Sequence, residues 1–234
     1  MIKELRKKYK NALLLDSGDF ISKEVNVPDL RAATSVEGAK LMKYDALNVA
    51  DGELTFGIEF LKNNFQKTNV PLLSANLTTK NDNHFVGQEF LIKKLDGLKV
   101  GIIGLVSPEY FDKETLTKGE LVIKNPEETL KKVLSEIQGK ANVIVLLSHL
   151  GYEATRELVQ KVNGIDVAIV GHGLQTNNIP ELVGKTLVVQ NSYKGRYLGT
   201  LSLTIDKNGS ISDYQGSAVE LSKTIPDDPE VAAL

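Results

Sequence analysis

Two aspartates and two histidines stand directly after four separate apolar segments of this sequence. Asp19 follows LLLDSG, Asp51 follows ALNVA, His149 follows VIVLLS and His172 follows VAIVG. Each apolar segment has the length of a buried strand, and polar groups that follow neighbouring strands gather at the carboxyl edge of an α/β sheet. Two carboxylates with two imidazoles suit Zn²⁺, Mn²⁺ or Fe²⁺, whereas Mg²⁺ and Ca²⁺ prefer oxygen ligands alone. These four residues are our candidate metal ligands.

Each candidate also has a structural interpretation. Asp19 could cap a following helix, Asp51 with the next glycine could form a simple turn, and a histidine at a strand end is more often hydrogen-bonded than metal-bound. One such residue would therefore indicate little. The coincidence of four after four strands is what favours a metal site.

Other polar residues carry weaker signals. His84 lies in the polar stretch KNDNH, which is typical of a surface loop. Ser148 precedes His149, but neighbours on a strand point to opposite faces, so the pair is not a catalytic dyad. Gly101 and Gly104 lack the third glycine of a dinucleotide-binding loop. We assign no catalytic residue from these patterns.

Composition excludes several classes of protein. The 234 residues contain 28 Lys and Arg against 30 Asp and Glu, a net charge of -2, so no basic surplus exists for a nucleic-acid partner. The absence of cysteine excludes disulfides, cysteine-ligated zinc, iron–sulfur clusters and thiol nucleophiles. No apolar run reaches membrane-spanning length, and the first residues, MIKELRKKYK, lack the apolar core of a signal peptide. We therefore expect no membrane partner and leave the compartment open.

Apolar strand patterns alternate with helical ones along most of the chain. A hairpin is expected around Asp96-Gly97, and Asn125 followed by proline and two acidic residues is a strong helix start. This order predicts an α/β fold, a layered αββα sandwich of two mixed sheets flanked by helices. We expect strands near residues 11–15, 46–49, 71–75, 90–95, 99–105, 143–147, 167–170, 186–190, 197–205 and 212–220, and helices near 36–43, 59–66, 125–138 and 154–162.

The motifs, taken in order, resemble one known family. LLLDSGD, DALNVADGELTFG, VPLLSANL, VIVLLSHLG, GIDVAIVGHGLQT and VVQNSYKGRYLGTLSL are similar to segments of the calcineurin-like metallophosphoesterases. The closest likeness is to the catalytic domain of the 5'-nucleotidase branch, which includes cyclic phosphodiesterases and thiosulfohydrolases. The resemblance implies the same sandwich, two metals at the strand ends and a phosphate-like anion or nucleotide as ligand. Members of this branch are often exported.

According to this resemblance, the sequence retains the ligands of one of the family's two metals. It places Asp19 at the bridging aspartate, Asp51 at the asparagine of the Asn-His-Glu motif, His149 in Ser-His-x-Gly, and His172 at the first histidine of Gly-His-x-His. All four ligands of one metal are therefore present in some form. Carried over residue by residue, the resemblance leaves ligands for one divalent cation, held by Asp19, Asp51, His149 and His172. The donor set favours Zn²⁺, Mn²⁺ or Fe²⁺.

The other half of that site departs from the family. Gly52 stands at the catalytic histidine, Leu174 stands at the second histidine of Gly-His-x-His, and the opening Asp-x-His motif has no counterpart in this sequence. We therefore expect no second metal and no catalytic residue of the family type. The resemblance assigns residues 1–222 to a metallophosphoesterase-like domain without the family's first strand, and residues 223–234 to a linker or the start of a further element.

Three functions remain open on the sequence. The first is a degenerate 5'-nucleotidase-like domain that keeps at most one metal and hydrolyses phosphoesters weakly or not at all. The second is an active metal-dependent phosphoesterase, which uses one metal or is restored by an Asp-x-His motif in a natural segment that precedes this sequence. The third is a metal-free structural or partner-binding module. Metal content separates the third function from the others, and turnover of a phosphoester separates the first two.

Overall fold

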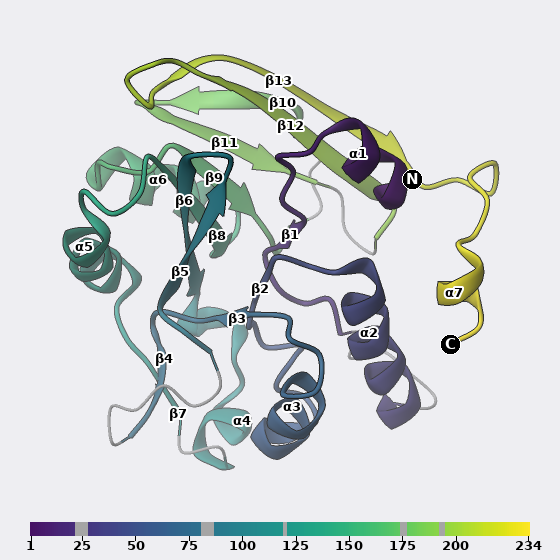
Figure 1. The fold of residues 1–234 in the computed structure, drawn as a ribbon. Coiled ribbons are helices and arrows are strands. Elements are labelled where there is room, and N and C mark those ends of the chain that lie inside the picture. The colour runs from purple at the N-terminus through teal and green to yellow at the C-terminus, as the bar shows by residue number, and fades with distance from the viewer. Residues whose placement is uncertain (22–27, 81–86, 119–120, 174–176, 192–194) are drawn as a thin grey trace.

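Two β-sheets face each other in the computed structural model, and helices cover the outer side of each sheet (Figure 1). The structure describes residues 1–21, 28–80, 87–118, 121–173, 177–191 and 195–234. The αββα sandwich inferred from the sequence is confirmed. Among the described residues, no helix combines the length and apolarity needed to cross a bilayer.

The larger sheet has six strands in the order β10-β11-β9-β8-β6-β5. Strands β6, β8, β9 and β11 run parallel, while the two edge strands are antiparallel to their neighbours. The parallel strands therefore all end at one edge of the sheet. The strands are β5 (Phe90–Leu95), β6 (Leu98–Val106), β8 (Val143–His149), β9 (Val167–Val170), β10 (Asn177–Val183) and β11 (Thr186–Gln190).

The smaller sheet is parallel throughout and consists of three short strands. These are β1 (Leu15–Asp16), β2 (Ala46–Asn48) and β3 (Leu72–Leu73), paired in that order. An apolar layer lies between the two sheets, and the buried side chains in it come from both. It includes Ala46, Leu73, Ile102, Val145 and Leu147.

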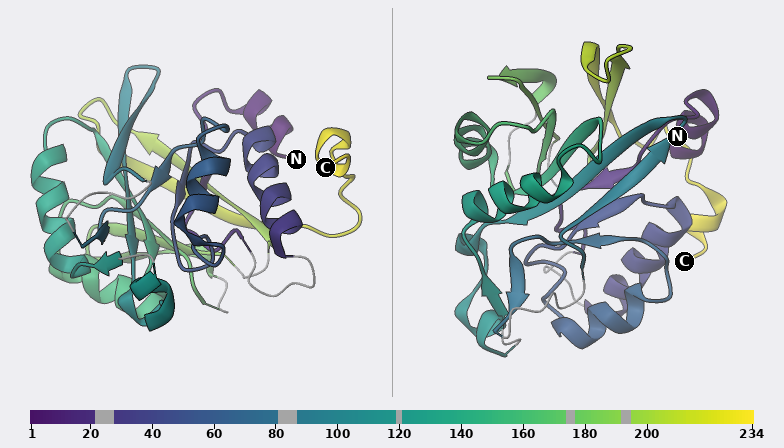
Figure 2. Two further views of the ribbon diagram at one scale, coloured as in Figure 1. Left: turned by 90° about the horizontal axis from the view of Figure 1, so that it is seen from below. Right: turned by 60° about the vertical axis from the view of Figure 1, so that its left-hand side comes forward.

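Helices pack on the outer faces of the two sheets through buried apolar side chains. Helices α2 (Pro28–Met42) and α3 (Gly57–Phe65) cover the small sheet, with Val36 and Leu61 in one cluster with Leu47. Helices α5 (Pro126–Ile137) and α6 (Tyr152–Lys161) cover the large sheet, with Val133 and Leu158 in a second cluster. Figure 2 shows these outer helices from two further directions.

Several short elements complete the described chain. Two-stranded sheets join β4 (Leu77–Thr79) to β7 (Leu121–Ile123), and β12 (Tyr197–Ile205) to β13 (Ile211–Glu220). The remaining helices are α1 (Ile2–Lys8), the 3-10 helix η1 (Pro108–Tyr110), α4 (Lys113–Lys118) and α7 (Pro229–Ala232). Lys3 on α1 forms ion pairs with Asp228 and Glu230, both at 2.7 Å, which tie the two ends of the chain together.

Most expected elements are present with bounds shifted by a few residues. The β5–β6 turn has Asp96 and Gly97 at φ 46° and 86°, and Asn125 caps α5 by accepting the backbone N–H groups of Glu127 and Glu128. The strand expected at 11–15 is shorter, because the Leu14 N–H donates to the side chain of Asp45 instead of a neighbouring strand. Strands β4, β7 and β10 were not expected.

The strand register places the polar groups of interest at one edge. Val106 pairs with His149, and Ser148 pairs with Val170, so β6, β8 and β9 end side by side. Strands β1 and β2 of the small sheet end near the same place, because the Asn48 side chain donates to the Leu105 carbonyl on β6. The fold therefore brings five strand ends to one location.

Candidate metal centre

The four candidate ligands lie together at this edge. Asp19 follows β1, Asp51 follows β2, His149 is the last residue of β8, and His172 follows β9. Each offers one ligand atom, and these atoms all lie within 4.8 Å of one another. Asp51 and His149 are buried, whereas Asp19 and His172 are exposed. The fold thus brings together four groups that are up to 153 positions apart in sequence, which a single cation could contact.

The ring of His149 is oriented by a backbone carbonyl. Its Nδ1 lies 3.0 Å from the carbonyl oxygen of Ser17, and because a carbonyl can only accept, Nδ1 carries the proton in the neutral ring. Nε2 then presents its lone pair toward the two carboxylates. Metal-binding histidines in proteins are commonly oriented in this way by a hydrogen bond from their other nitrogen.

The surroundings of Nε2 fit a cation. This atom is buried and has no hydrogen-bond partner among the described residues. It lies 3.4 Å from Asp19 Oδ2 and 3.7 Å from Asp51 Oδ1, which are longer separations than a good hydrogen bond but normal for two ligands of one ion. Burial lowers the pKa of His149, but the Asp19, Glu53 and Asp51 carboxylates outweigh burial and raise it above its usual value. The site therefore attracts positive charge.

Asn48 supports the same carbonyl. Its side-chain amide is fully buried and donates to the Ser17 carbonyl at 3.2 Å and to the Leu105 carbonyl at 2.9 Å. The Ser17 hydroxyl donates to the Ile169 carbonyl at 2.7 Å. These contacts join the ends of β1, β2, β6 and β9, so the carbonyl that orients His149 is itself fixed. Sequence reasoning missed Asn48 because an asparagine inside an apolar strand gives no sign of its distant partners.

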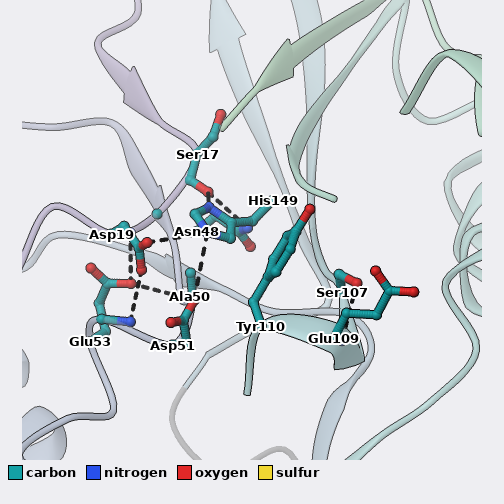
Figure 3. A network of polar contacts seen from close by, with 12 residues as sticks. Ser17, Asp19, Asn48, Ala50, Asp51, Glu53, Ser107, Glu109, Tyr110 and His149 are labelled. Carbon is teal, nitrogen blue, oxygen red and sulfur yellow. Dashed lines mark hydrogen bonds and ion pairs between the residues drawn. The ribbon is translucent and has the colours of Figure 1, made fainter. Parts of the chain in front are cut away.

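Glu53 accepts hydrogen bonds from both the loop that contains Asp19 and the loop that contains Asp51 (Figure 3). Its carboxylate is fully buried and accepts the backbone N–H groups of Asp19, Ile21 and Ala50 at 3.0, 3.2 and 2.8 Å. Burial and the nearby Asp19 charge raise the pKa of Glu53 to about 7, although the three N–H donors oppose that rise. Glu53 therefore joins the backbone at Asp19 and Ile21 to the backbone just before Asp51.

Position 52 has no room for a side chain. The Gly52 N–H donates to Asp19 Oδ1 at 2.7 Å, so the backbone is drawn against that carboxylate. A Cβ at this position would lie 2.7 Å from Asp19 Oδ1 and 2.7 Å from the Ile21 carbonyl oxygen. These separations are well inside van der Waals contact, and one of the atoms belongs to the backbone. A larger residue at position 52 would therefore require the loop to change its conformation.

Tyr110 is a further site residue that sequence reasoning missed. Its ring stacks on His172 with centroids 3.4 Å apart and packs edge-on against His149 at 5.9 Å. It belongs to η1, directly after β6, so a polar aromatic residue after a strand beside β8 was the available signal. Ser148, by contrast, points to α6, where its hydroxyl lies 2.7 Å from that of Thr155.

Some residues named in the sequence analysis lie outside the described part of the chain. These are His84 and Leu174. Gly101 and Gly104 lie within β6, where a Cβ would meet the Ile137 and Asn48 side chains, so they serve close packing.

No protein-family model matches this chain. Over 99% of its length it is 27% identical to a human 5'-nucleotidase, of which it covers 44%. The calcineurin-like phosphoesterase YfkN from Bacillus subtilis superposes with a TM-score of 0.82 at 25% identity, over 99% of this chain and 84% of that one. This chain is related to the 5'-nucleotidases. The resemblance drawn from its motifs is confirmed.

A third similarity concerns the fold alone. The sulfate thiohydrolase SoxB from Thermus thermophilus superposes with a TM-score of 0.85 at 23% identity, over 99% of this chain and 44% of that one. The chain spans less than half the length of the curated 5'-nucleotidases that it matches. The comparison thus concerns one domain of those longer proteins.

The donor set defines what a bound ion could do here. Two carboxylates and two neutral imidazoles balance the charge of one divalent cation, and they are the usual ligands of Zn²⁺, Mn²⁺ and Fe²⁺. When bound, such a cation polarises a phosphoryl oxygen and lowers the pKa of a coordinated water. Asp19, Asp51, His149 and His172 would hold it.

Proposed function

We propose that this domain is a degenerate 5'-nucleotidase-like metallophosphoesterase domain, which binds one divalent cation and hydrolyses phosphoesters weakly or not at all. The cation is Zn²⁺, Mn²⁺ or Fe²⁺, held by Asp19, Asp51, His149 and His172. The observation that carries the low activity is the packing of Gly52 against Asp19 and Ile21.

Gly52 supports this proposal in two ways, by the chemistry that glycine lacks and by the lack of room for a larger side chain. It occupies the position at which the family resemblance places a catalytic histidine, and glycine offers neither a proton nor a charge to a leaving group. General acid help of that kind contributes roughly 10²–10⁴-fold to rate. A Cβ at this position would collide with Asp19 and with the Ile21 backbone, so the loop in its present conformation does not accommodate a histidine.

A second cation would lack one of the ligands that the family uses. The resemblance places a histidine at position 174, where this chain has leucine. Two-metal phosphoesterases stabilise both the attacking and the leaving oxygen between ions about 3.5–4 Å apart. With one ion, half of that charge stabilisation is absent.

The ligand of the domain belongs to the phosphate class. The relatives include human 5'-nucleotidase and the trifunctional nucleotide phosphoesterase YfkN, which supports a nucleotide or a phosphate-like anion as the group that approaches the cation. Such an anion would complete the coordination of an ion that four protein ligands leave open to solvent at exposed Asp19 and His172.

The decisive experiment measures metal content and turnover on the same preparation. Protein purified without chelators should contain about one equivalent of a transition metal by elemental analysis, and His149→Ala should contain none. An exposed aspartate outside the site supplies a matched control, and Asp213→Asn should keep the wild-type content. Hydrolysis of a generic phosphoester with Mn²⁺, Zn²⁺, Co²⁺ or Mg²⁺ should remain far below about 1 s⁻¹.

Two results would overturn the proposal in different ways. Turnover at about 1–10³ s⁻¹ that disappears in His149→Ala would establish an active hydrolase. A protein without metal that gains none on titration with Zn²⁺ or Mn²⁺ would instead indicate a structural or partner-binding module.

A further inference from the structure

Tyr110 reaches across the end of β8 to contact His172. Its hydroxyl donates to the Leu150 carbonyl at 3.0 Å, one residue beyond that strand. Its ring lies nearly parallel to the His172 ring, with an interplanar angle of 14° and centroids 3.4 Å apart. The edge of the same ring faces His149 (Figure 3). One tyrosine thus contacts both histidines of the candidate centre.

His172 depends on such a contact more than His149 does. His149 is the last residue of a paired strand, is fully buried and is held through the Ser17 carbonyl. His172 lies beyond the end of β9, is exposed and has a φ of 55°, in the left-handed region that side chains rarely adopt. Because no strand pairing fixes this residue, its neighbours must direct the imidazole toward Asp19 and Asp51.

Gly151 leaves space for the Tyr110 hydroxyl. Gly151 has a φ of 77°, and a Cβ there would lie 2.7 Å from the Tyr110 hydroxyl oxygen. A side chain at position 151 would therefore displace the phenol from the Leu150 carbonyl. The hydrogen bond, the stacked ring and the space at Gly151 are three separate features of the same arrangement.

We propose that Tyr110 is a positioning residue of the metal centre, which holds the His172 imidazole in the direction needed to share a cation with Asp19, Asp51 and His149. This inference rests on the proposed function, since it assigns a role within that same site. The aromatic face performs the positioning, and the hydroxyl fixes the ring. The phenol ring lies flat against the imidazole and so limits its rotation.

Histidine NMR tests the geometry without any metal. The chain has three histidines, so each ring proton signal can be assigned by substitution. The His172 ring protons should be shifted upfield by the Tyr110 ring in the wild type and in Tyr110→Phe, and the shift should disappear in Tyr110→Leu. Tyr214→Leu, a change of the same type on distant β13, should leave the His172 signals unchanged.

Calorimetric titration with Mn²⁺ and Zn²⁺ tests the role. We expect Tyr110→Leu to weaken binding by about 10-fold or more, and Tyr110→Phe to retain most of the affinity, in line with the roughly 10–100-fold effects of residues that orient metal ligands. In a His172→Ala background, Tyr110→Leu should change the affinity by less than about 2-fold, because the residue it positions is absent. A loss of folding would weaken both backgrounds equally, and thermal unfolding of each variant measures that contribution.

The outcomes are distinguishable. If the wild type binds cation and Tyr110→Leu binds it equally well, this inference is overturned and the proposed function stands. An equal loss in the presence and absence of His172 also overturns it, since Tyr110 would then act on general stability. A wild-type protein that binds no cation overturns the proposed function and this role together.

Discussion

Polar side chains lie at both ends of strands β8 and β9, but their arrangements differ. At the amino end, the Asp166 carboxylate accepts the Ile144 N–H at 2.7 Å, and the Thr186 hydroxyl donates to the Ile165 carbonyl at 2.8 Å. Each polar group there has a backbone partner on a neighbouring segment. These contacts close the sheet at that end.

At the carboxyl end the polar groups also have backbone partners, but their ligand atoms face one another. Nε2 of His149 lies 3.4 and 3.7 Å from two carboxylate oxygens, and the His172 ring is close by. Such a convergence of ligand atoms is the arrangement expected of groups that could share one cation. The amino end therefore closes the sheet through hydrogen bonds to the backbone, whereas the carboxyl end presents a candidate metal centre.

The largest effect should come from removing the buried imidazole. His149→Ala should weaken Mn²⁺ or Zn²⁺ binding by more than about 100-fold, since it removes a ligand directly, where even residues that only orient ligands account for roughly 10–100-fold. Loss of a fully buried side chain should also lower the free energy of unfolding by about 2–4 kcal/mol. Calorimetry and urea denaturation in EDTA measure the two effects. If His149→Ala bound metal as tightly as the wild type, the carboxyl end of β8 would not be a metal centre, and the difference proposed between the two ends would be wrong.

Gly52→Ala should give the next largest effect, on stability. A Cβ at 2.7 Å from Asp19 Oδ1 and from the Ile21 carbonyl forces the loop to shift, and overpacking of this kind commonly costs about 1–3 kcal/mol. Urea denaturation in EDTA provides the measurement. The control is Gly38→Ala on α2, which we expect to be neutral or stabilising. Gly184 also has no close neighbours, but its positive φ would itself make alanine unfavourable.

Asp51→Asn should have a moderate effect on metal binding. The amide keeps an oxygen ligand but removes one of the two negative charges of the site, so we expect about 10-fold weaker binding of Mn²⁺, or about 1.4 kcal/mol. Calorimetry at low and high salt would reveal the charge contribution. Binding that is equal to or tighter than wild type would show that the second carboxylate charge is not what attracts the ion.

Asp166→Asn should have the smallest effect, at the opposite end of the strands. Burial raises the pKa of this carboxyl, and the Ile144 N–H opposes that rise only in part. The folded state therefore binds the proton more tightly than the unfolded state, so the contribution of Asp166 to stability is greatest in acid and is lost as pH rises through its folded pKa. The amide does not titrate. We expect the stability of the variant relative to wild type to increase from pH 3 to pH 6, by less than about 1 kcal/mol.

Denaturation curves of both proteins across that range check the sign. A difference that is constant with pH, or that favours the wild type as pH rises, would contradict the assignment of Asp166 to a burial-dominated environment. Metal affinity should be the same in both proteins, which tests the separation of the two ends directly.

The sequence alone was informative about local elements and about the ligand set. Helix α5 is specified by Asn125-Pro126 and its acidic first turn, and the β5–β6 hairpin by Asp96-Gly97, because capping and turn preferences act between near neighbours. Strand β10 escaped prediction because Pro180 and Glu181 interrupt its apolar pattern. Proline is tolerated there because β10 is an edge strand.

The sequence also determined that Asp19, Asp51, His149 and His172 follow strands, and therefore that they could meet. Only the tertiary structure decided how they meet. The Ser17 carbonyl that orients His149 is 132 positions away, Glu53 joins the Asp19 and Asp51 loops, and Tyr110 crosses the end of β8 to reach His172. These contacts depend on which strands are neighbours and on side-chain packing across sheets, and local sequence patterns do not encode either. For the same reason, the glycine at position 52 can be read from the sequence, but only the fold reveals that no larger residue fits there.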